Sequence, residues 1–428
     1  MKDPARRATK CAAKLRLAVP VTLLAILAIA CTRSDSSAMA QVAHPLAHHE
    51  IKPSQLPAPH ATSSAGNGPE VIRQPASARL NLPPGFEIST WAEGGLQNPR
   101  WLALAPNGDV FLADSDSGRI LVFRDPANSG KATQRFVFAE KLALPFGMAF
   151  HGDYLYVGET NAVVRFRYRS GQTKAEAAPE KLVDLPGHGY RQHWTRNLLF
   201  TPDGAKMLVT VGSASNDSPG EDPIRAAISE YNPDGSGHRL LATGTRNPIG
   251  AAFYPGTSQL WALVQERDGL GDDLPSDYLT HIQDGGFYGW PYAYLGSHPD
   301  PNNDERPDLV KKTITPDVLF QAHSATMDVV FYQGQMFPKD YQGDAFVSMH
   351  GSWNRSKRTG YKVVRVHFQG GKPVGGYDDF VTGWMLSPES RNVWGRPVGL
   401  LVLKDGSLLV ADDGGNKIWR VTYRGGAR

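Results

Sequence analysis

The chain has 428 residues, with 45 Lys and Arg against 42 Asp and Glu, which gives a formal net charge of +3. The first thirty residues contain six of those basic residues and one acidic residue, so the rest of the chain has no positive excess and we expect no nucleic-acid partner. The 44 glycines, the 32 prolines and the short apolar runs between them indicate many strands and turns, and they exclude a helical bundle.

The amino terminus reads as an export signal. A basic region precedes an apolar run over residues 17–30, which is too short for a comfortable membrane span. Two cleavage sites compete: the sequence LAIAC, ending at Cys31, is typical of a bacterial lipoprotein, and Ala38-Met39-Ala40 is typical of a signal peptidase site. We favour the first, because it directly follows the apolar run. Residues 1–31 are therefore predicted to be a lipoprotein-type signal peptide, with a lipid anchor at Cys31 and a periplasmic or outer-membrane-anchored location.

The remaining sequence divides into a tether and a folded body. Residues 32–79 are rich in Ser, Ala, Pro and His and lack a periodic apolar pattern, which predicts a disordered tether. The only two cysteines, Cys11 and Cys31, lie in the targeting segment, so the body has neither a disulfide nor a thiol nucleophile.

One pattern recurs from residue 82 onward, in which apolar strands are joined by turns such as Asn-Gly or Asp-Gly. Such turns between strand-forming runs are a hairpin signal, and a repeat of about fifty residues is typical of propeller blades. Residues 80–428 are therefore predicted to form an all-β, six-bladed β-propeller, with residues 84–92 completing the last blade. The copies begin at Asn98, Leu144, Thr195, Arg246, Thr326 and Arg396.

Arginines occur at one phase of this repeat. Each stands at or near the turn that enters the first strand of a copy, so radial repetition would direct them toward a common centre. One Arg in a turn is ordinarily a surface charge, but four at one phase favour a pocket for an anionic ligand. These residues are Arg100, Arg196, Arg246 and Arg396.

Two further stretches contain residues suited to chemistry. His193 lies directly before the third copy, and nearby arginines would lower its pKa and make it available as a general base. A half-buried His bonded to the backbone is an equally good reading of that residue alone. The sequence HGSWNRS supplies His350, a stacking face at Trp353 and a carboxylate-binding fork at Arg355.

The stretch from 244 to 291 combines a cationic turn with many carboxylates. Oxygen donors at short irregular spacing suit a hard cation such as Ca²⁺, although an acidic surface loop would have the same composition. The acidic residues are Glu266, Asp268, Asp272, Asp273 and Asp277. No P-loop, GxGxxG, HExxH, GxSxG or kinase motif occurs, so nicotinamide and nucleoside triphosphate chemistry have no support.

Four motifs in this order, TRNL from Thr195, GTRNP from Gly244, QDGGFYGWP and HGSWNR, resemble the glucose/sorbosone dehydrogenase family, and within it the L-sorbosone dehydrogenase branch. The resemblance covers residues 82–423. It implies a six-bladed propeller that holds pyrroloquinoline quinone (PQQ) and calcium over the channel. The sequence departs from the glucose-oxidising relatives at Leu144-Pro145-Phe146 and at His350-Gly351, so the resemblance does not imply glucose specificity.

The same resemblance implies roles for individual residues. His193 takes the place of the catalytic base, and Arg246 and Asn247 match the Arg-Asn pair at the quinone. Backbone oxygens around Arg267 and Asp268 match the calcium loop. Asp272, Asp273 and Asp277 then hold that loop, through a structural ion or turn hydrogen bonds. The other arginines, His350 and Trp353 would bind the cofactor.

The expected function is therefore that of an exported quinoprotein dehydrogenase. It would oxidise an aldose, or the aldehyde of a keto-aldose, and pass electrons to a soluble or membrane acceptor. Two alternatives stay open: a calcium-dependent lactone hydrolase on the same fold, and a non-catalytic propeller that binds peptide or glycan.

Overall fold

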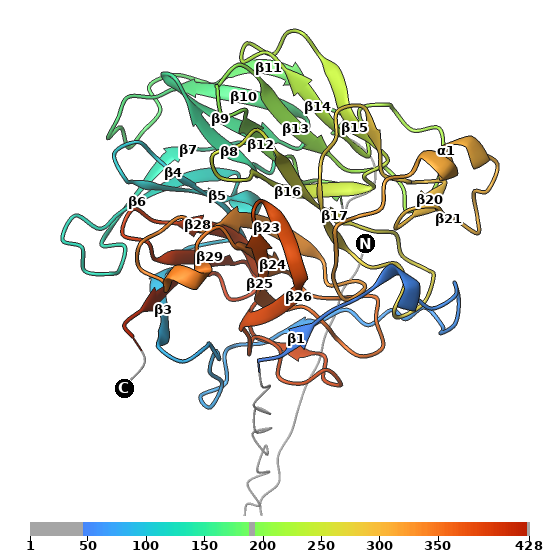
Figure 1. The fold of residues 1–428 in the computed structure, drawn as a ribbon. Coiled ribbons are helices and arrows are strands. Elements are labelled where there is room, and N and C mark those ends of the chain that lie inside the picture. The colour runs from blue at the N-terminus through green and yellow to red at the C-terminus, as the bar shows by residue number, and fades with distance from the viewer. Residues whose placement is uncertain (1–45, 188–192, 426–428) are drawn as a thin grey trace, which may run out of the picture. The chain divides into compact units, whose positions relative to one another are not determined.

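Four-stranded antiparallel sheets, arranged as the six blades of a β-propeller, dominate the computed structural model of the protein (Figure 1). The structure describes residues 46–187 and 193–425. All of these belong to one compact unit, Ala40–Arg428. The predicted fold class is confirmed.

The blades are numbered here in chain order. Blade 1 contains β4 (Pro99–Leu104), β5 (Val110–Asp114), β6 (Arg119–Arg124) and β7 (Gln134–Ala139). Blade 2 contains β8 (Met148–His151), β9 (Tyr154–Glu159), β10 (Ala162–Arg167) and β11 (Glu180–Asp184). Blade 3 contains β12 (Leu198–Phe200), β13 (Met207–Val211), β14 (Ala227–Tyr231) and β15 (Arg239–Thr243).

The other three blades follow the same plan. Blade 4 contains β16 (Asn247–Phe253), β17 (Leu260–Gln265), β18 (Tyr278–His281) and β22 (Val318–Leu319). Blade 5 contains β23 (Thr326–Phe331), β24 (Ala345–Met349), β25 (Lys362–Gln369) and β26 (Lys372–Val381). Blade 6 contains β28 (Pro397–Val402), β29 (Leu408–Asp412), β30 (Lys417–Tyr423) and, from the other end of the body, β3 (Phe86–Glu93).

A Pro-x-Gly sequence brings the inner strands of neighbouring blades close together. A Cβ at Gly147 would lie 2.6 Å from the Cα of Asn197, and one at Gly250 would lie 2.8 Å from the Cα of Asp328, both in the next blade. A Cβ at Gly399 would likewise lie 2.5 Å from the carbonyl oxygen of Arg100. Only glycine permits such an approach between backbones, so this motif draws the blade entries together at the centre.

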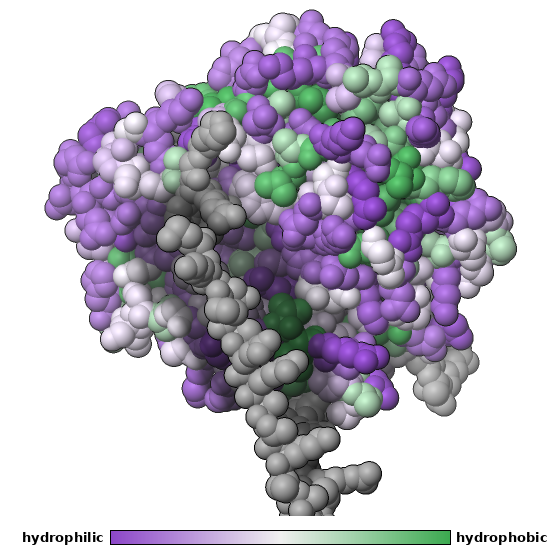
Figure 2. Space-filling model, turned by 180° about the vertical axis from the view of Figure 1, so that it is seen from behind, coloured by the Kyte–Doolittle hydropathy of each residue, from purple (hydrophilic) through white to green (hydrophobic). Residues whose placement is uncertain are grey.

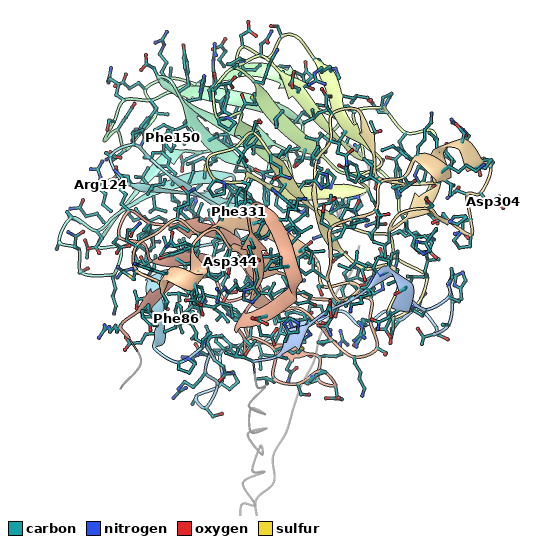
Figure 3. All side chains as sticks on the ribbon, in the orientation of Figure 1. Phe86, Arg124, Phe150, Asp304, Phe331 and Asp344 are labelled. Atoms are coloured by element: carbon teal, nitrogen blue, oxygen red, sulfur yellow. The ribbon has the colours of Figure 1, made fainter. Side chains whose placement is uncertain are left out.

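Strand β3 closes the ring by pairing with β30, from Phe86 opposite Tyr423 to Glu93 opposite Lys417. The prediction that residues 84–92 complete the last blade is therefore confirmed. Phe86, labelled in Figure 3, packs edge-on against Phe337 at 4.8 Å and Phe380 at 5.0 Å between ring centroids. Aromatic contacts of this kind stabilise the closed ring beyond the area they bury.

An insertion between β18 and β22 contains four short elements. They are β19 (Gly286–Phe287), which pairs in parallel with β15, the hairpin of β20 (Ala293–Tyr294) and β21 (His298–Pro299), and α1 (Pro307–Lys312). Single 3-10 turns occur at η1 (Pro53–Gln55), η2 (Ser115–Ser117) and η4 (Lys339–Tyr341). Within the described residues, none of the helices has the length and apolar character needed to cross a bilayer.

Residues 46–79, which the composition assigns to a disordered tether, lie against the propeller instead. Strand β1 (His48–His49) pairs with the edge of β26, and β2 (Glu70–Val71) pairs in parallel with β27 (Asn392–Val393). These contacts are made by backbone groups and by side-chain hydrogen bonds from His48 and His49 to Asp378 and Asp379. The spacing of apolar residues does not predict such contacts. The prediction of a disordered tether is therefore wrong for residues 46–79. The signal peptide predicted for residues 1–31, including Cys31, lies outside the described residues.

Candidate functional site

Residues at the entries of the blades line one cavity of about 260 Å³. They come from the starts of blades 1, 3, 4, 5 and 6 and from the loops that follow β17 and β24. The lining residues are Arg100, His193, Trp194, Thr195, Arg246, Ile249, Gln265, Glu266, Asp268, Asp277, His323, Ala325, Met327, His350, Trp353, Asn354 and Arg396. The cavity therefore contains nine of the predicted site residues that supply His, Arg, Trp or carboxylate groups, from segments far apart in the chain.

The protonation of His193 follows from its hydrogen bonds. Its Nδ1 lies 3.0 Å from both the carbonyl oxygen and the Oγ of Ser213. The hydroxyl already donates to the carbonyl oxygen of Ser215 at 2.6 Å, so both oxygens of Ser213 act as acceptors. Nδ1 must therefore carry the proton, and the lone pair of the neutral ring lies on Nε2.

The pKa of His193 is held well below its ordinary value. Burial is the main cause, and the positive charges of Arg246, Arg196 and Arg225 add to it. The sequence predicts this direction from the arginines alone, so desolvation is the cause that it misses. Gly212 packs closely against His193, because a Cβ there would lie 2.9 Å from the Cβ of His193.

Arg246 and Asn247 are held between blades 3 and 4. The guanidinium of Arg246 donates to the carbonyl oxygen of Glu266 at 2.6 Å and to two oxygens of Asn216 at 3.0 and 2.9 Å. It also lies 3.5 Å from Asp268. Asn247 donates to Gln265 at 3.0 Å, while its Oδ1 is buried without a partner in the structure. This oxygen faces Gly212, since a Cβ there would lie 2.2 Å from it, and Asn247 does not line the cavity.

Two buried carboxyl groups stand behind this pair. Glu266 is 4% exposed, and burial raises its pKa to about 8 against the opposing charge of Arg246. One of its oxygens, Oε1, has no partner. Burial also raises the pKa of Asp277 to about 6, although this group accepts backbone hydrogen bonds from Glu266 and Ala325. Asp277 therefore ties blade 4 to the entry of blade 5.

Opposite them lies a group of ionised residues around Asp413. This carboxylate accepts a hydrogen bond from Arg100 and lies 2.8 Å from Nε2 of His350. Arg396 donates to the carbonyl oxygen of His350 at 3.1 Å. Burial opposes ionisation of Asp413, but His350, Arg100 and Arg396 outweigh it and hold its pKa well below the ordinary value. The Nε of Arg100 is buried without a partner, and its guanidinium lies over the ring of Trp194.

The loop after β24 supplies the open wall of the cavity. The side chain of Trp353 is 37% exposed. Asn354 donates to Asp268 and lies 3.0 Å from Nδ1 of His323, whose Nε2 in turn lies 2.8 Å from the carbonyl oxygen of Gly271. Trp353 therefore presents an exposed ring at the cavity. On the face drawn in Figure 2, hydrophobic residues occur in separate groups among hydrophilic ones.

The sequence patterns do not predict a functional role for Asp413, His323, Asn354 or Gln265. Asp413 lies in the sequence DDGG, which has the composition of an ordinary turn. His323 precedes the copy that begins at Thr326, much as His193 precedes the copy that begins at Thr195. That shared placement is the signal that could have found it.

Six predicted site residues do not line the cavity, and Asn247, described above, is one of them. Arg196 donates to the carbonyl oxygens of His193, Thr195 and Pro186, so it holds the segment that carries the base. Arg267 forms a buried ion pair with Asp300 and a second pair with Asp217. Arg355 pairs with Asp273, and Asp272 accepts hydrogen bonds from the backbone and hydroxyl of Ser356.

The carboxylates predicted to bind calcium therefore do not converge. Among the described residues, no three His, Cys, Asp or Glu side chains form a group that could hold a metal ion. The carbonyl oxygen of Glu266 accepts from Arg246, and that of Asp268 accepts from Asn216. These oxygen atoms already accept hydrogen bonds within the protein, so the residues as arranged do not fit a calcium site. We therefore derive no catalytic step through calcium.

The fold and the cavity define a class: a six-bladed propeller with a buried neutral histidine beside several arginines. The glucose/sorbosone dehydrogenase profile matches residues 96–355, and the chain belongs to that family. A profile described as TrAA12-like matches residues 297–424. Membership relates the chain to PQQ-dependent sugar dehydrogenases and supports an oxidoreductase.

Solved structures share the fold at low identity. A carbohydrate-active enzyme of family AA12 from Trichoderma reesei is 21% identical, with a TM-score of 0.71 over 84% of this chain and 100% of that one. The holo PQQ domain of pyranose dehydrogenase from Coprinopsis cinerea is 20% identical, with a TM-score of 0.70 over 83% and 99%. The PQQ-bound aldose sugar dehydrogenase from Streptomyces coelicolor is 18% identical, with a TM-score of 0.57 over 82% and 100%.

Proposed function

We propose that the protein is an exported quinoprotein dehydrogenase that oxidises an aldose or the aldehyde of a keto-aldose such as L-sorbosone, with PQQ as its cofactor. The observation that carries this proposal is a neutral His193, with its lone pair on Nε2, in the same cavity as Arg100, Arg246 and Arg396. Family membership and the PQQ-containing relatives support it.

The residues of the cavity fit PQQ, a planar ortho-quinone with three carboxylates. The unpartnered Nε of Arg100 is a buried donor for an anionic group. Arg396 adds a second guanidinium beside Arg100, while Asp413 offsets only part of their charge. Trp353 presents an exposed ring on which a planar ligand can stack.

Bound PQQ would supply a two-electron acceptor that takes hydride from the substrate carbon. The chain's own part is to hold the substrate hydroxyl and to remove its proton at Nε2 of His193. Ser213 keeps the ring in the tautomer that this step requires, because its two oxygens accept from Nδ1–H. Base assistance of this kind contributes about 10²- to 10⁴-fold to the rate.

The substrate must present a hydroxyl on the carbon that loses hydride. An aldose meets this condition as its cyclic hemiacetal, and the aldehyde of a keto-aldose meets it as a hydrate. We place sorbosone-like substrates first because the four ordered motifs resemble the L-sorbosone dehydrogenase branch.

The location and the electron acceptor are part of the same proposal. Residues 1–31 would act as a lipoprotein-type signal with an anchor at Cys31, and residues 80–428 would form the catalytic domain. A soluble or membrane acceptor in the periplasm would reoxidise the cofactor.

The test is to titrate the purified protein with PQQ, with and without added Ca²⁺, and to follow its visible absorption. Dye reduction is then assayed with L-sorbosone and a panel of aldoses. We expect saturable quinone binding and turnover with at least one of these sugars. A protein that binds no quinone under either condition contradicts the proposal.

A further inference from the structure

The segment over residues 60–72, here called the strap, crosses the two loops that build the open wall of the cavity. The backbone N–H of His60 donates to the carbonyl oxygen of Leu270 at 2.7 Å. Thr62 Oγ1 accepts from the backbone N–H of Asp272 at 2.8 Å. A Cβ at Gly271 would lie 2.9 Å from the same hydroxyl, so the strap and this loop are in close contact.

Asn67 is the residue of the strap that holds the second loop, residues 352–359. Its backbone N–H donates to the carbonyl oxygen of Trp353 at 2.7 Å. Its side-chain amide donates to the carbonyl oxygens of Arg355 at 3.0 Å and Ser356 at 2.9 Å. One strap residue therefore satisfies three carbonyls at the tip of the loop that carries Trp353.

The same loop binds the strap through Arg358, whose side chain is 2% exposed. Its guanidinium donates to the carbonyl oxygen of Asn67, to Oδ1 of Asn67 at 2.6 Å and to the carbonyl oxygen of Gly68 at 3.3 Å. Ser390 accepts a further hydrogen bond at 2.7 Å. A buried cation is costly unless it is well hydrogen-bonded, so losing the strap would leave much of this guanidinium unsatisfied.

The base of the loop is closed independently of the strap. Ser352 and Thr359 exchange hydrogen bonds, N–H to carbonyl oxygen at 3.0 Å and N–H to Oγ at 3.1 Å. The strap therefore acts at the tip, between these fixed ends, where Trp353 and Asn354 face the cavity. Asn354 also contacts Asp268 of the first loop, so the two loops and the strap form one assembly.

We propose that Asn67 is a positioning residue of the cofactor site, through which an N-terminal segment outside the propeller fixes the loop that carries Trp353 and Asn354. The inference rests on the proposed function for the identity of the ligand, and on the hydrogen bonds alone for the positioning. The strap then belongs to the functional site and is more than a connection between the export signal and the propeller.

The experiment compares Asn67→Ala and Asn67→Asp with the wild-type chain. Alanine removes both the amide that donates to Arg355 and Ser356 and the oxygen that accepts from Arg358. Aspartate keeps an oxygen for Arg358, so the strap stays docked, but it places a carboxylate against the carbonyl oxygens of Arg355 and Ser356. Gln74→Ala is the matched control, because that amide lies just after the strap and donates to the nearby carbonyl oxygen of Ala78 at 3.3 Å.

Two measurements are made on each protein: amide hydrogen exchange of residues 352–359 without ligand, and the dissociation constant of PQQ from tryptophan fluorescence. We expect faster exchange in this loop and about tenfold weaker PQQ binding in both Asn67 variants, and neither change in Gln74→Ala. Unchanged exchange in both variants overturns the proposal, as does faster exchange with unchanged PQQ affinity. A wild-type protein that binds no PQQ contradicts the proposed function instead, while the exchange result still decides whether Asn67 positions the loop.

Discussion

Both sides of the cavity are largely buried, but they hold their carboxyl groups in opposite states. On the side of blades 3 and 4, burial lowers the pKa of His193 and raises that of Glu266, so both are neutral near pH 7. On the side of blades 1, 5 and 6, Asp413 stays ionised because it accepts a hydrogen bond from Arg100 and lies near Arg396, while His350 beside it is neutral near pH 7. Desolvation favours neutral forms, and only a close partner of opposite charge reverses that preference.

This difference separates two tasks within one site. A base must be neutral before it accepts a proton, which the first side provides. A site for an anionic cofactor needs fixed positive charge, which the second side provides while Asp413 keeps its arginines in place. The predictions below disturb one side at a time, from the largest expected effect to the smallest.

Replacing the base should have the largest effect. In His193→Gln the amide can still donate to Ser213, but the side chain has no nitrogen lone pair that accepts a proton. We expect kcat to fall by about 10²- to 10⁴-fold while PQQ affinity stays within about twofold of wild type. The check is dye reduction under saturating sugar, with PQQ binding measured separately. Equal loss of binding and turnover would show that His193 acts through cofactor binding.

Breaking the ionised side should mainly lower stability. Asp413→Asn leaves Arg100 buried without its carboxylate, and losing one partner of a buried pair costs about 3–5 kcal/mol of unfolding free energy. Asp273→Asn is the matched control, since the carboxylate of that ion pair is 58% exposed and the change should cost less than about 1 kcal/mol. Urea unfolding of the two variants distinguishes these values. Similar losses in both would argue against the role assigned to Asp413.

The outcome for individual residues shows what the sequence can predict. The repeat predicts all six blades because each hairpin turn and each apolar strand is a local signal, as at Gly108 between β4 and β5. It also predicts which arginines stand at blade entries. It does not predict where their side chains end: Arg100 faces the cavity, whereas Arg196 donates to three backbone carbonyl oxygens.

Contacts between segments distant in sequence are harder to predict. Asp413 acquires its role from Arg100 and His350, which are 313 and 63 residues away along the chain. The strap has no periodic pattern of apolar residues. It forms hydrogen bonds to one loop about 210 residues away and to another about 290 residues away. No local pattern encodes such partners, so sequence reasoning identifies the residues of the blade entries and misses those that hold the entries in place.

Acid should destabilise the protein through His350. Burial lowers its pKa to about 4, with a further contribution from Arg396 and against the attraction of Asp413, while an unfolded His titrates near 6.5. The unfolded chain therefore binds a proton that the folded chain does not, and stability is lost as pH falls from about 6.5 toward 4. The loss is about 3 kcal/mol at most. His193 acts in the same direction, whereas Glu266, Asp277 and Asp412, whose pKa values burial raises to about 8, 6 and 6, act in the opposite one.

His350→Gln isolates this contribution. The variant should show a shallower fall in unfolding free energy between pH 6.5 and 4 than the wild-type protein, measured by urea titration at intervals of half a pH unit. Parallel curves for the two proteins would mean that His350 does not titrate differently in the folded and unfolded states.

The smallest expected effect concerns the exposed ring between the two sides. Trp353 has its side chain at the cavity and is 37% exposed, so Trp353→Leu should change the unfolding free energy by less than about 0.5 kcal/mol. If the indole stacks on a planar cofactor, PQQ affinity should fall about tenfold, because leucine retains apolar area but offers no aromatic face. Trp353→Phe keeps such a face and should recover most of that loss. Equal affinities for the leucine and phenylalanine variants would show that the residue contributes apolar area alone, and the cofactor would then be held by the arginines.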